Sequence, residues 1–374
     1  MSTEYFIALD VHVSFCEMAV VTKLGKLAKR LTCPTSIPAL VEALEEVRRP
    51  RRLTFEEGPL ADWLTRNLRQ RVDELVVCEP RRNRLIAKDS DKDDPLDAEK
   101  LAQLYRGGYL KGVHQAGTLE RSLLKQHVGF YHDRVRERVR QGNQLVAQLR
   151  RHGVFVKVAD LLDAQERRAA WSRLPPNRIL HADLDRLLQV YDVLLRQEME
   201  IHQDLLRGAR REEPVRRFAE LPGIGWIRAV TFYVYLDTPW RFQSKSALWR
   251  YCGIGLKRRH SGSGPMNSRL DHAGHRRLKD VLLGAAKSAA ASADSPFADK
   301  FHYWTQEEGL HPSIARRNVA RSLAATLWSL WKTGNKYDPA LVHGVGVKAL
   351  SRNRTTIEPG RSSLGGTGQK SPRA

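Results

Sequence analysis

One acidic stretch reads Lys88-Asp89-Ser90-Asp91-Lys92-Asp93-Asp94-Pro95-Leu96-Asp97-Ala98, and it places five aspartates within nine residues of a chain whose formal net charge is +21. Proline suits the first position of a helix, where its missing N–H is not needed. Pro95 therefore predicts a helix that begins here, with Asp94 as its N-cap and Asp97 as its N3 residue. Both carboxylates would then lie on one side of the first helical turn.

Two interpretations of this stretch remain after a third is excluded. An acidic N-cap with a second acid three residues later resembles a capping box and suits the helix dipole. A calcium-binding loop fails, because its sixth and twelfth positions would be Asp94 and Lys100 rather than glycine and glutamate. A divalent-metal site is the other interpretation, since carboxylates with few other ligands suit Mg²⁺ and leave positions for phosphate oxygens. That site requires partner carboxylates elsewhere in the chain.

The composition of the whole chain bounds its class. Its 374 residues are enough for two or three domains, and a hydrophobic content of 41% is ample for folded cores. Lys and Arg outnumber Asp and Glu by 63 to 42, and the isoelectric point is about 10.1. A surplus of this size indicates a polyanionic partner, most simply nucleic acid. Ribosomal or membrane-surface binding is the alternative, but the basic residues are spread through folded segments rather than confined to one tail.

The cysteines and the apolar runs indicate the compartment. Cys16, Cys33, Cys78 and Cys252 are far apart, without a Cys-x-x-Cys pair, which argues against a zinc finger and fits reduced intracellular thiols. The sequence shows neither a signal peptide nor an apolar run of about 18 residues. We therefore expect a cytoplasmic protein with no membrane partner.

The first part of the chain, to about residue 110, alternates between short apolar runs and helical patterns. No Gly-x-Gly-x-x-Gly turn follows the first strand, so dinucleotide binding has no support. The order strand-strand-strand-helix-strand-helix-strand-helix is that of a ribonuclease-H-like α/β fold. The expected strands cover residues 5–10, 16–22, 27–33, 52–56 and 74–78, and the expected helices begin at Ser36, at Pro59 and in the acidic stretch.

Four acidic residues fall at topologically related places in this expected fold. Asp10 ends the first strand, and Glu56 or its neighbour Glu57 ends the fourth. Asp94 and Asp97 open the last helix. In ribonuclease-H-like sheets, carboxylates at the ends of the first and fourth strands converge on a later helix. Each acid alone could be a turn or edge residue, but together they form a two-metal constellation suited to phosphodiester chemistry.

Three of these segments resemble the RuvC-like domain of the DEDD transposases in the insertion-sequence family numbered one hundred and ten. They are Phe6-Ile7-Ala8-Leu9-Asp10-Val11-His12, Glu56-Glu57-Gly58-Pro59 and Lys92-Asp93-Asp94-Pro95-Leu96-Asp97-Ala98-Glu99-Lys100-Leu101-Ala102. The resemblance implies that Asp10, Glu56, Asp94 and Asp97 hold Mg²⁺. The family usually has threonine before its third acid, whereas this chain has Asp93. Asp93 could therefore replace Asp94, just as Glu57 could replace Glu56.

Residues 111–212 contain two long helical patterns of apolar residues. They predict two amphipathic helices, antiparallel or arranged as a coiled-coil arm, which would act as a spacer and as the oligomerisation element of a homodimer or tetramer. Four arginines surround the first helix, and they either form a solvated surface or bind a nucleic-acid backbone. The apolar positions run from Leu124 to Leu149 and from Leu184 to Leu206, and the arginines are Arg134, Arg136, Arg138 and Arg140.

A glycine-rich turn opens the C-terminal segment, where Leu221-Pro222-Gly223-Ile224-Gly225 precedes an apolar helix. The turn resembles the hairpin of a helix-hairpin-helix unit, in which the backbone N–H groups of Gly223 and Gly225 would face a phosphate. An ordinary Pro-Gly turn is the alternative. The residues expected to follow as a compact core include Trp240, Phe242, Leu248 and Cys252.

A basic run, Lys257-Arg258-Arg259-His260, then leads into the loop Ser261-Gly262-Ser263-Gly264. Such a loop alone is usually a flexible connector. Together with the turn before it and the helix opened by Arg276 and Arg277, it resembles the second domain of the same transposases, where the serine of the Ser-Gly pair is the nucleophile. The resemblance therefore assigns the nucleophile to Ser261, with Ser263 as a weaker candidate.

Phosphodiester chemistry at this loop needs help from its neighbours, because a serine hydroxyl is a poor nucleophile at neutral pH. Lys257, Arg258 and Arg259 could bind the phosphate and stabilise its added charge, and Arg276 and Arg277 are further candidates for nucleic-acid contact. This chain has Ala273-Gly274-His275 where Lys-Gly-Asn is commoner in the family. The resemblance covers about residues 4–340 and implies that the acids and the serine meet across subunits.

The chain as a whole is thus expected to combine an α/β part with a mainly helical part. The expected domains are a RuvC-like ribonuclease-H-fold domain at 1–110, a helical coiled-coil spacer at 111–212, a serine transposase domain at 213–345 and a disordered basic tail at 346–374.

The function that the resemblance implies is that of a transposase or recombinase. Ser261 would attack a DNA phosphodiester to form a phosphoserine link and a free 3′-hydroxyl, with Mg²⁺ held by the acids. A structured RNA encoded at the end of the mobile element would guide the reaction. Two alternatives stay open from the residues alone: a metal-dependent junction nuclease that uses the four acids and water, and a non-catalytic nucleic-acid-binding scaffold.

Overall fold

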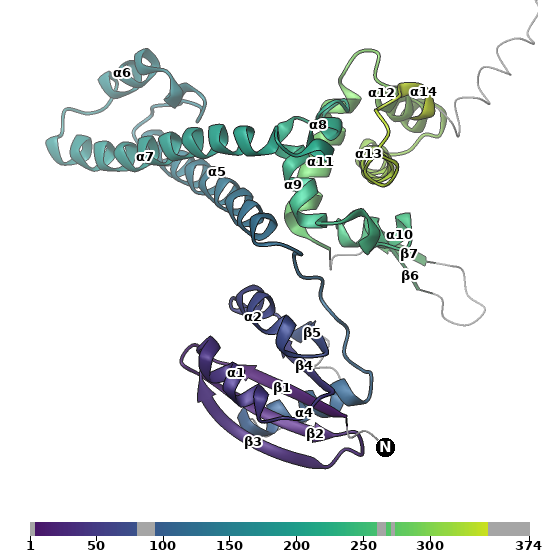
Figure 1. The fold of residues 1–374 in the computed structure, drawn as a ribbon. Coiled ribbons are helices and arrows are strands. Elements are labelled where there is room, and N and C mark those ends of the chain that lie inside the picture. The colour runs from purple at the N-terminus through teal and green to yellow at the C-terminus, as the bar shows by residue number, and fades with distance from the viewer. Residues whose placement is uncertain (1–3, 81–93, 260–266, 271–273, 343–374) are drawn as a thin grey trace, which may run out of the picture. The chain divides into compact units, whose positions relative to one another are not determined.

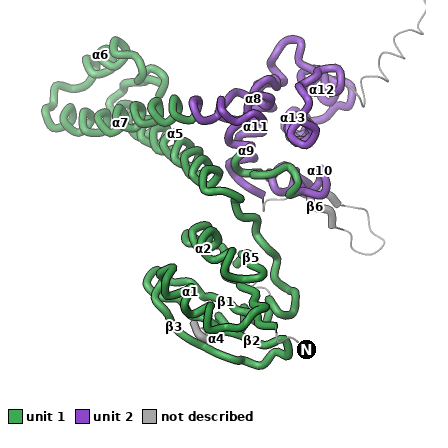
Figure 2. Tube along the Cα trace, in the orientation of Figure 1, with its two compact units in different colours: residues 1–205, 234–241 green, residues 206–233, 242–374 purple. Residues whose placement is uncertain are grey.

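The computed structural model describes residues 4–80, 94–259, 267–270 and 274–342. They belong to two compact units (Figure 2), one formed by residues 1–205 with 234–241 and the other by residues 206–233 with 242–374. The expected domain boundaries at 110 and 212 stay predictions. The expected basic tail, 346–374, lies outside the described residues.

The first unit contains a five-stranded mixed sheet in the order β3-β2-β1-β4-β5 (Figure 1). The first three strands are antiparallel, whereas β1, β4 and β5 run parallel to one another. This order fits a ribonuclease-H-like sheet, and the expected strands are confirmed to within one or two residues at their ends. Their bounds are β1 Tyr5–Val11, β2 Phe15–Thr22, β3 Leu27–Pro34, β4 Arg51–Glu56 and β5 Glu74–Cys78.

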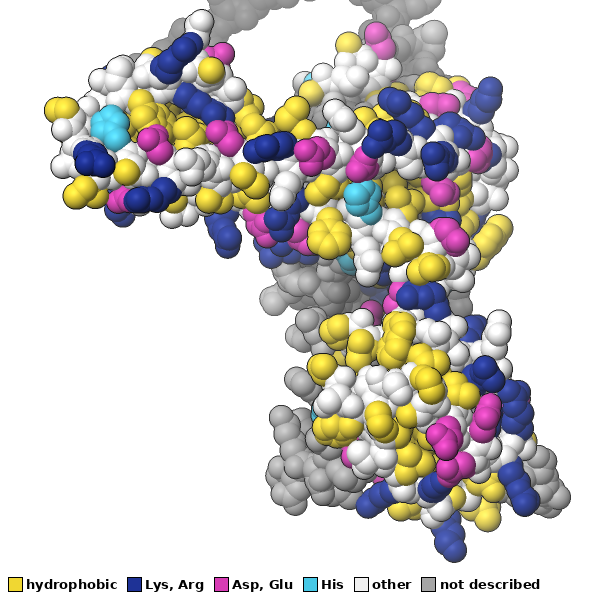
Figure 3. Space-filling model, turned by 60° about the vertical axis from the view of Figure 1, so that its left-hand side comes forward, with side chains coloured by type: hydrophobic (Ala, Val, Ile, Leu, Met, Phe, Trp, Pro, Cys, Tyr) yellow, Lys and Arg dark blue, Asp and Glu magenta, His cyan; other side chains and the backbone are white. Residues whose placement is uncertain are grey.

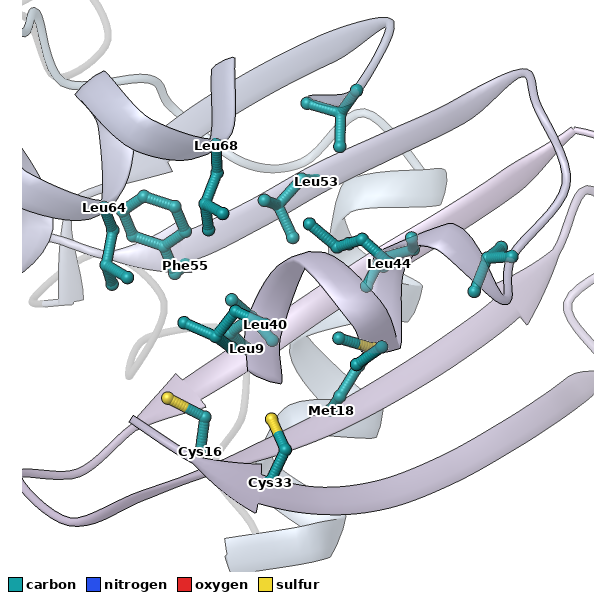
Figure 4. Packing of buried hydrophobic residues seen from close by; sticks show 14 of the residues in the cluster. Leu9, Cys16, Met18, Cys33, Leu40, Leu44, Leu53, Phe55, Leu64 and Leu68 are labelled. Carbon is teal, nitrogen blue, oxygen red and sulfur yellow. The ribbon is translucent and has the colours of Figure 1, made fainter. Parts of the chain in front are cut away.

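Helices cover both faces of this sheet. Alternation along β1 directs Leu9 to the face where α1 (Ile37–Glu45) and α2 (Ala61–Leu68) pack (Figure 4), and it directs Ala8 to the face covered by α4 (Asp94–Arg106). The side chain of Ser36 accepts a hydrogen bond from the Ala39 N–H, which confirms the expected cap of α1. The expected helix of the acidic stretch is also confirmed, since α4 begins at Asp94.

Two long helices, α5 (Leu119–Arg151) and α7 (Arg178–Ala209), confirm the expected amphipathic pair, and α6 (Ala164–Ser172) lies between them in sequence. Leu145 and Leu149 of α5 pack in one core with Leu184 and Tyr191 of α7. The Gln141 side chain donates to the Leu187 carbonyl at 3.1 Å, and Tyr131 contacts His202 farther along, so the helices are antiparallel. A coiled-coil geometry for this pair stays a prediction.

Three of the four arginines around α5 form ion pairs within the protein. Arg138 is largely buried and bonds the Glu198 carboxylate of α7, which raises the pKa of the guanidinium above its ordinary value. Arg134 pairs with Glu137 at 2.6 Å, and Arg136 pairs with Asp133 at 3.3 Å. These contacts favour a role for Arg138 in joining the two helices, and they leave the exposed Arg140 as a candidate for contact with a nucleic-acid backbone.

The second unit is mainly helical, with one small β-hairpin. The last long helix, α13, ends at Gly334, which adopts the left-handed conformation with φ 72° that glycine favours. The hairpin strands are β6 Leu256–Arg259 and β7 Asn267–Leu270. The last residues of α9 belong to the first unit. The helices are α8 Glu213–Ala219, α9 Trp226–Leu236, α10 Lys245–Tyr251, α11 Arg276–Ala290, α12 Pro296–His302, α13 Pro312–Thr333 and α14 Pro339–Val342.

One residue of the expected C-terminal core is on the surface instead. Phe242, Leu248 and Cys252 are buried, as predicted, but Trp240 is 71% exposed. The chain forms a single tight turn at Pro239–Arg241, and this turn buries Pro239 while it directs the next residue outward. Among the described helices, none combines the length and apolar composition needed to cross a membrane.

Candidate active site

Two of the four acids lie on neighbouring strands at one end of the sheet. In the parallel pairing of β1 with β4, Leu9 is opposite Phe55, so Asp10 and Glu56 occupy the next position on each strand. Leu9 and Phe55 both belong to the core under α1 and α2. Because side chains alternate along a strand, Asp10 and Glu56 both face the side covered by α4. The same alternation favours Glu56 over its neighbour Glu57 as the second acid.

The direction of α4 brings its acidic start to the same end of the sheet. Near its C-terminus, Tyr105 packs edge-on against Phe6 with ring centroids 5.6 Å apart, and Gln103 donates to the Gly25 carbonyl at 2.8 Å. Four strand residues from Phe6 to Asp10 span about 13 Å. Eight helix residues from Tyr105 back to Asp97 span about 12 Å, so Asp97 lies nearly level with Asp10 along the sheet.

The third acid is placed only through its backbone. α4 begins at Asp94, so its backbone lies one helical turn before Asp97, while Asp93 lies outside the described residues. The choice between Asp93 and Asp94 therefore stays a prediction. The described backbone directs Asp10, Glu56 and the start of α4 toward one end of the sheet, and a joint site of the four acids stays a prediction.

His12 is a member of this site that the sequence analysis did not identify. Its Nε2 lies 3.1 Å from Oδ2 of Asp10, and its ring stacks on Phe15 with centroids 4.5 Å apart. The His12 carbonyl also accepts a hydrogen bond from Thr35 at 2.8 Å. These contacts fix the imidazole, which in turn orients the Asp10 carboxylate. The sequence feature that could have identified His12 is its position two residues after Asp10, the acid that ends the expected first strand.

The donor chemistry of this end of the sheet fits Mg²⁺, because Asp10, Glu56 and Asp97 offer only carboxylate oxygens. Among the side chains that the structure describes, no three His, Cys, Asp or Glu residues form a cluster that could hold a metal ion. The Asp94 side chain is outside that description. A complete Mg²⁺ site is therefore a proposal that needs the fourth acid.

The candidate nucleophile lies in the connection of the β-hairpin. β6 pairs with β7 in antiparallel register, with Arg259 opposite Asn267, so the basic run Lys257–Arg259 forms the end of β6. Ser261 and Ser263 follow directly and lie outside the described residues. The sequence predicted a basic run before this loop but not that the run is a strand.

The base of the hairpin is held by a close contact between two glycines. Gly253, with φ 70°, follows α10, and Gly274 precedes α11. A Cβ added to Gly274 would lie 2.2 Å from the Gly253 Cα, so only glycine fits there. The His275 N–H donates to the Tyr251 carbonyl at 2.7 Å and joins the same two helix ends. Beyond them, Arg276 is exposed at the start of α11, while Arg277 is half-buried.

Helix α13 forms hydrogen bonds with the segment that leads into β6 and with α10. The Arg321 Nε donates to the Ile254 carbonyl at 2.7 Å, and the Trp249 indole N–H donates to the Arg321 carbonyl at 3.0 Å. Burial lowers the pKa of the Arg321 guanidinium. These long-range contacts had no local signal in the sequence, and they anchor the strand that leads to Ser261.

Two family models match separate parts of the chain. One, a transposase model of the DEDD type in the IS110 family, matches residues 7–153, which include all four acids. The other is described as the transposase IS116/IS110/IS902 family and matches residues 215–302, which include Ser261. The chain belongs to the IS110 family of transposases. The acidic end of the sheet and the serine-bearing hairpin thus fall in the two conserved parts of an IS110-family protein.

A curated relative from Sinorhizobium fredii (strain NBRC 101917 / NGR234) carries the name "Putative transposase y4pF/y4sB". It is 25% identical to this IS110-family chain over 258 residues, which are 67% of this chain and 65% of the relative. The match therefore spans slightly less than two thirds of the relative's length.

The glycine-rich turn of this IS110-family chain has a clear packing role. Gly223 has φ 77°, and a Cβ there would lie 2.4 Å from the Ala285 carbonyl of α11. The Arg228 guanidinium donates to the Gly223 carbonyl at 2.6 Å. Gly225, by contrast, is exposed and an added Cβ would meet no atom within 4 Å. Gly223 thus allows the turn to approach α11 closely, and phosphate binding by either glycine stays a prediction.

The contact between Gly253 and Gly274 gives a first testable prediction. Gly274→Ala would force a methyl group into backbone, and we expect a loss of about 3 kcal/mol in the free energy of unfolding. Thermal melting of the purified chain measures this loss. Gly225→Ala is the matched control, because its methyl group enters open space. Equal melting temperatures for the two variants would contradict the close contact.

Proposed function

We propose that this IS110-family chain is a DNA transposase that cuts and rejoins DNA strands. The observation that carries the proposal is the gathering of Asp10, Glu56 and the acidic start of α4 at one end of a ribonuclease-H-like sheet. Carboxylates at such an edge suit phosphodiester chemistry with divalent metal. The match of the second family model to the serine-bearing part supports a second reactive group.

In the proposed reaction, the Ser261 hydroxyl attacks the phosphorus of a DNA phosphodiester. A bond forms between the serine oxygen and phosphorus, and the bond to the 3′-oxygen breaks. The serine hydroxyl gives up its proton and the released 3′-oxygen takes one up, so the products are a phosphoserine link and a free 3′-hydroxyl. In rejoining, a 3′-hydroxyl from another strand attacks the phosphoserine and returns the serine hydroxyl.

The proposed roles of the other residues follow from their charge. Asp10, Glu56, Asp94 and Asp97 would hold Mg²⁺, which when bound would polarise the phosphate and neutralise its developing charge. His12 orients the Asp10 carboxylate through their hydrogen bond. Lys257, Arg258 and Arg259 would attract the phosphate to the end of β6.

The proposed partners are two nucleic acids, DNA as the substrate and a structured RNA as the guide. The charge of +21 supports binding to DNA and to a structured RNA, and the family resemblance supports the guide role of that RNA. Lys and Arg side chains are scattered among Asp and Glu over the face shown in Figure 3 instead of being gathered in one patch. A homodimer or tetramer is proposed on the same resemblance.

A reconstituted joining reaction tests the proposed function. The purified full-length chain would be incubated with Mg²⁺, two labelled DNA duplexes carrying the element end and its target, and RNA transcribed from the DNA beside the gene. We expect joined strands that contain both labels. Metal-dependent cutting without joining would indicate a nuclease, and binding without cutting would indicate a scaffold.

We also predict that nucleic-acid binding by this chain depends strongly on salt, because each phosphate contact releases counterions. The affinity for duplex DNA should fall by a factor of at least about 100 between about 50 and 200 mM salt, as expected for four or more phosphate contacts. Fluorescence anisotropy at a series of salt concentrations measures the slope. A flat plot of log affinity against log salt would contradict a role for the basic surplus in binding.

A further inference from the structure

A pocket of about 670 Å³ lies beside the outer strand of the sheet in the first unit. One side is formed by the end of α2 and the following turn η1 (Arg69–Arg71), and another by β5. The remaining wall is the segment 112–117, which we call the strap. Of the acids whose side chains the structure describes, Asp10, Glu56 and Asp97 do not line this pocket, which is therefore distinct from the candidate active site.

The strap is held in place by backbone contacts with β5 and by a side-chain contact with Asp237. The Val113 N–H donates to the Val77 carbonyl at 2.6 Å, and Gly112 pairs with Cys78 as an isolated bridge. His114 Nε2 lies 2.6 Å from Oδ2 of Asp237, whose side chain is only 12% exposed. The wall is therefore formed before any ligand binds, which is usual for ligand pockets.

The pocket combines an apolar floor with polar side chains. Leu75 contributes most of the apolar surface, since Val77 is only 2% exposed, and Gln70 and Gln115 contribute amides that can donate and accept hydrogen bonds. Small ligands commonly occupy pockets of about 300–1,000 Å³. A flat apolar ring with hydrogen-bonding edges, such as a nucleobase, has the size and the chemistry that this lining offers.

The charges around the pocket leave one cation uncompensated. Arg66 pairs with Asp62, and His114 pairs with Asp237. Arg69 is exposed and lines the pocket, and no carboxylate in the described parts of the chain pairs with it. A guanidinium in this position favours a phosphate, which it can bind through two parallel hydrogen bonds.

We propose that this pocket binds one unpaired nucleotide of a nucleic-acid strand, with its base against Leu75 and its phosphate at Arg69. A strand is favoured over a free nucleotide because the chain carries a net charge of +21, which attracts a polyanion far more strongly than a single phosphate. The proposal shares with the proposed function the premise of nucleic-acid binding. It does not depend on Ser261 or on the four acids.

Photo-crosslinking of the full-length chain tests this pocket directly. The probes are a single-stranded RNA of twelve nucleotides carrying 4-thiouridine and a DNA of the same sequence carrying 4-thiothymidine. We expect crosslinks, mapped by mass spectrometry, in the peptides that contain residues 65–77 or 112–117. Crosslinks confined to other peptides would overturn the proposal. Loss of the pocket crosslinks in the presence of micromolar uridine monophosphate would assign the pocket to a free nucleotide and would also overturn it.

Paired variants add a quantitative test. Arg69→Ala should weaken single-strand binding by about three- to tenfold and reduce the slope of log affinity against log salt by about 0.7, the value for one phosphate contact. Arg71→Ala is the matched control, because Arg71 lies in the same turn and is exposed, but it pairs with Glu45 and does not line the pocket. Equal affinities for the two variants would overturn the proposal.

A variant that fills the pocket separates shape from charge. Gly117 lines the pocket, and a Cβ there would meet no atom within 4 Å, so the first atom of the Gly117→Phe side chain has open space at this wall. We expect this variant to melt at the temperature of the original chain and to lose the pocket crosslinks. Retention of those crosslinks would overturn the proposal. DNA joining is not part of this readout, so failure here would leave the proposed function standing.

Discussion

Asp10→Asn is expected to reduce DNA cutting and joining by a factor of at least about 100, while the fold remains intact. Asparagine keeps the size of the side chain and a hydrogen-bond acceptor for His12, but it lacks the negative charge that Mg²⁺ requires. Asp97→Asn should have the same effect, because Asp97 lies nearly level with Asp10 at the start of α4. Joining assays and thermal melting on the same preparations measure activity and stability together.

Glu17→Gln provides the matched control for the acids. Glu17 is directly opposite Asp10 on β2, so both side chains are on the same face of the sheet, but Glu17 accepts a hydrogen bond from Thr32 and is not among the four acids. Removal of the Glu17 charge in this variant should leave DNA joining unchanged. If Asp10→Asn only weakened the fold by about 1 kcal/mol and kept its activity, the acids would be helix and strand caps.

Ser261→Ala is expected to remove strand joining completely, while DNA and RNA binding are retained. The substitution deletes one hydroxyl group and leaves Lys257, Arg258 and Arg259 in place to attract phosphate. Joining is measured with end-labelled DNA, and binding is measured by fluorescence anisotropy. Ser263→Ala is the control, because it changes the same connection between β6 and β7 without touching the proposed nucleophile.

The sheet was predictable because the signals for its strands and helix starts are local. Short apolar runs defined the strands, and Ser36 and Pro95 marked helix starts. The strand order then placed the acids at one edge, and the observed register of β1 with β4 agrees with that placement. The sequence did not assign a role to His12, because its contact with Asp10 depends on the conformation after β1.

The serine-bearing hairpin was harder to predict because its strands carry no apolar alternation. Lys257, Arg258 and Arg259 form most of β6, and a run of cations gives no strand signal. Pairing with β7 and support from α10 and α13 stabilise the strand instead. The approach of Gly253 to Gly274 likewise joins segments that are distant in sequence, and only the folded chain shows why glycine is required at both positions.

The long helices illustrate the same limit for charged residues. Apolar spacing predicted α5 and α7, but it could not distinguish a solvated arginine from one that joins two helices. The bond from Arg138 to Glu198 spans 60 residues of sequence, and it appears only once the helices are antiparallel. Charge alone therefore overestimates how many arginines of α5 are available for a nucleic-acid backbone.

A denaturing gel tests the central claim, serine-based strand transfer, most directly. The full-length chain would be incubated with Mg²⁺, guide RNA and end-labelled target DNA, and then separated under conditions that preserve only covalent bonds. We predict a protein–DNA adduct with the original chain and with Ser263→Ala, and none with Ser261→Ala. An adduct that persists in Ser261→Ala but disappears in Ser263→Ala would move the nucleophile by two residues. An adduct that persists in both variants would contradict serine chemistry at this hairpin.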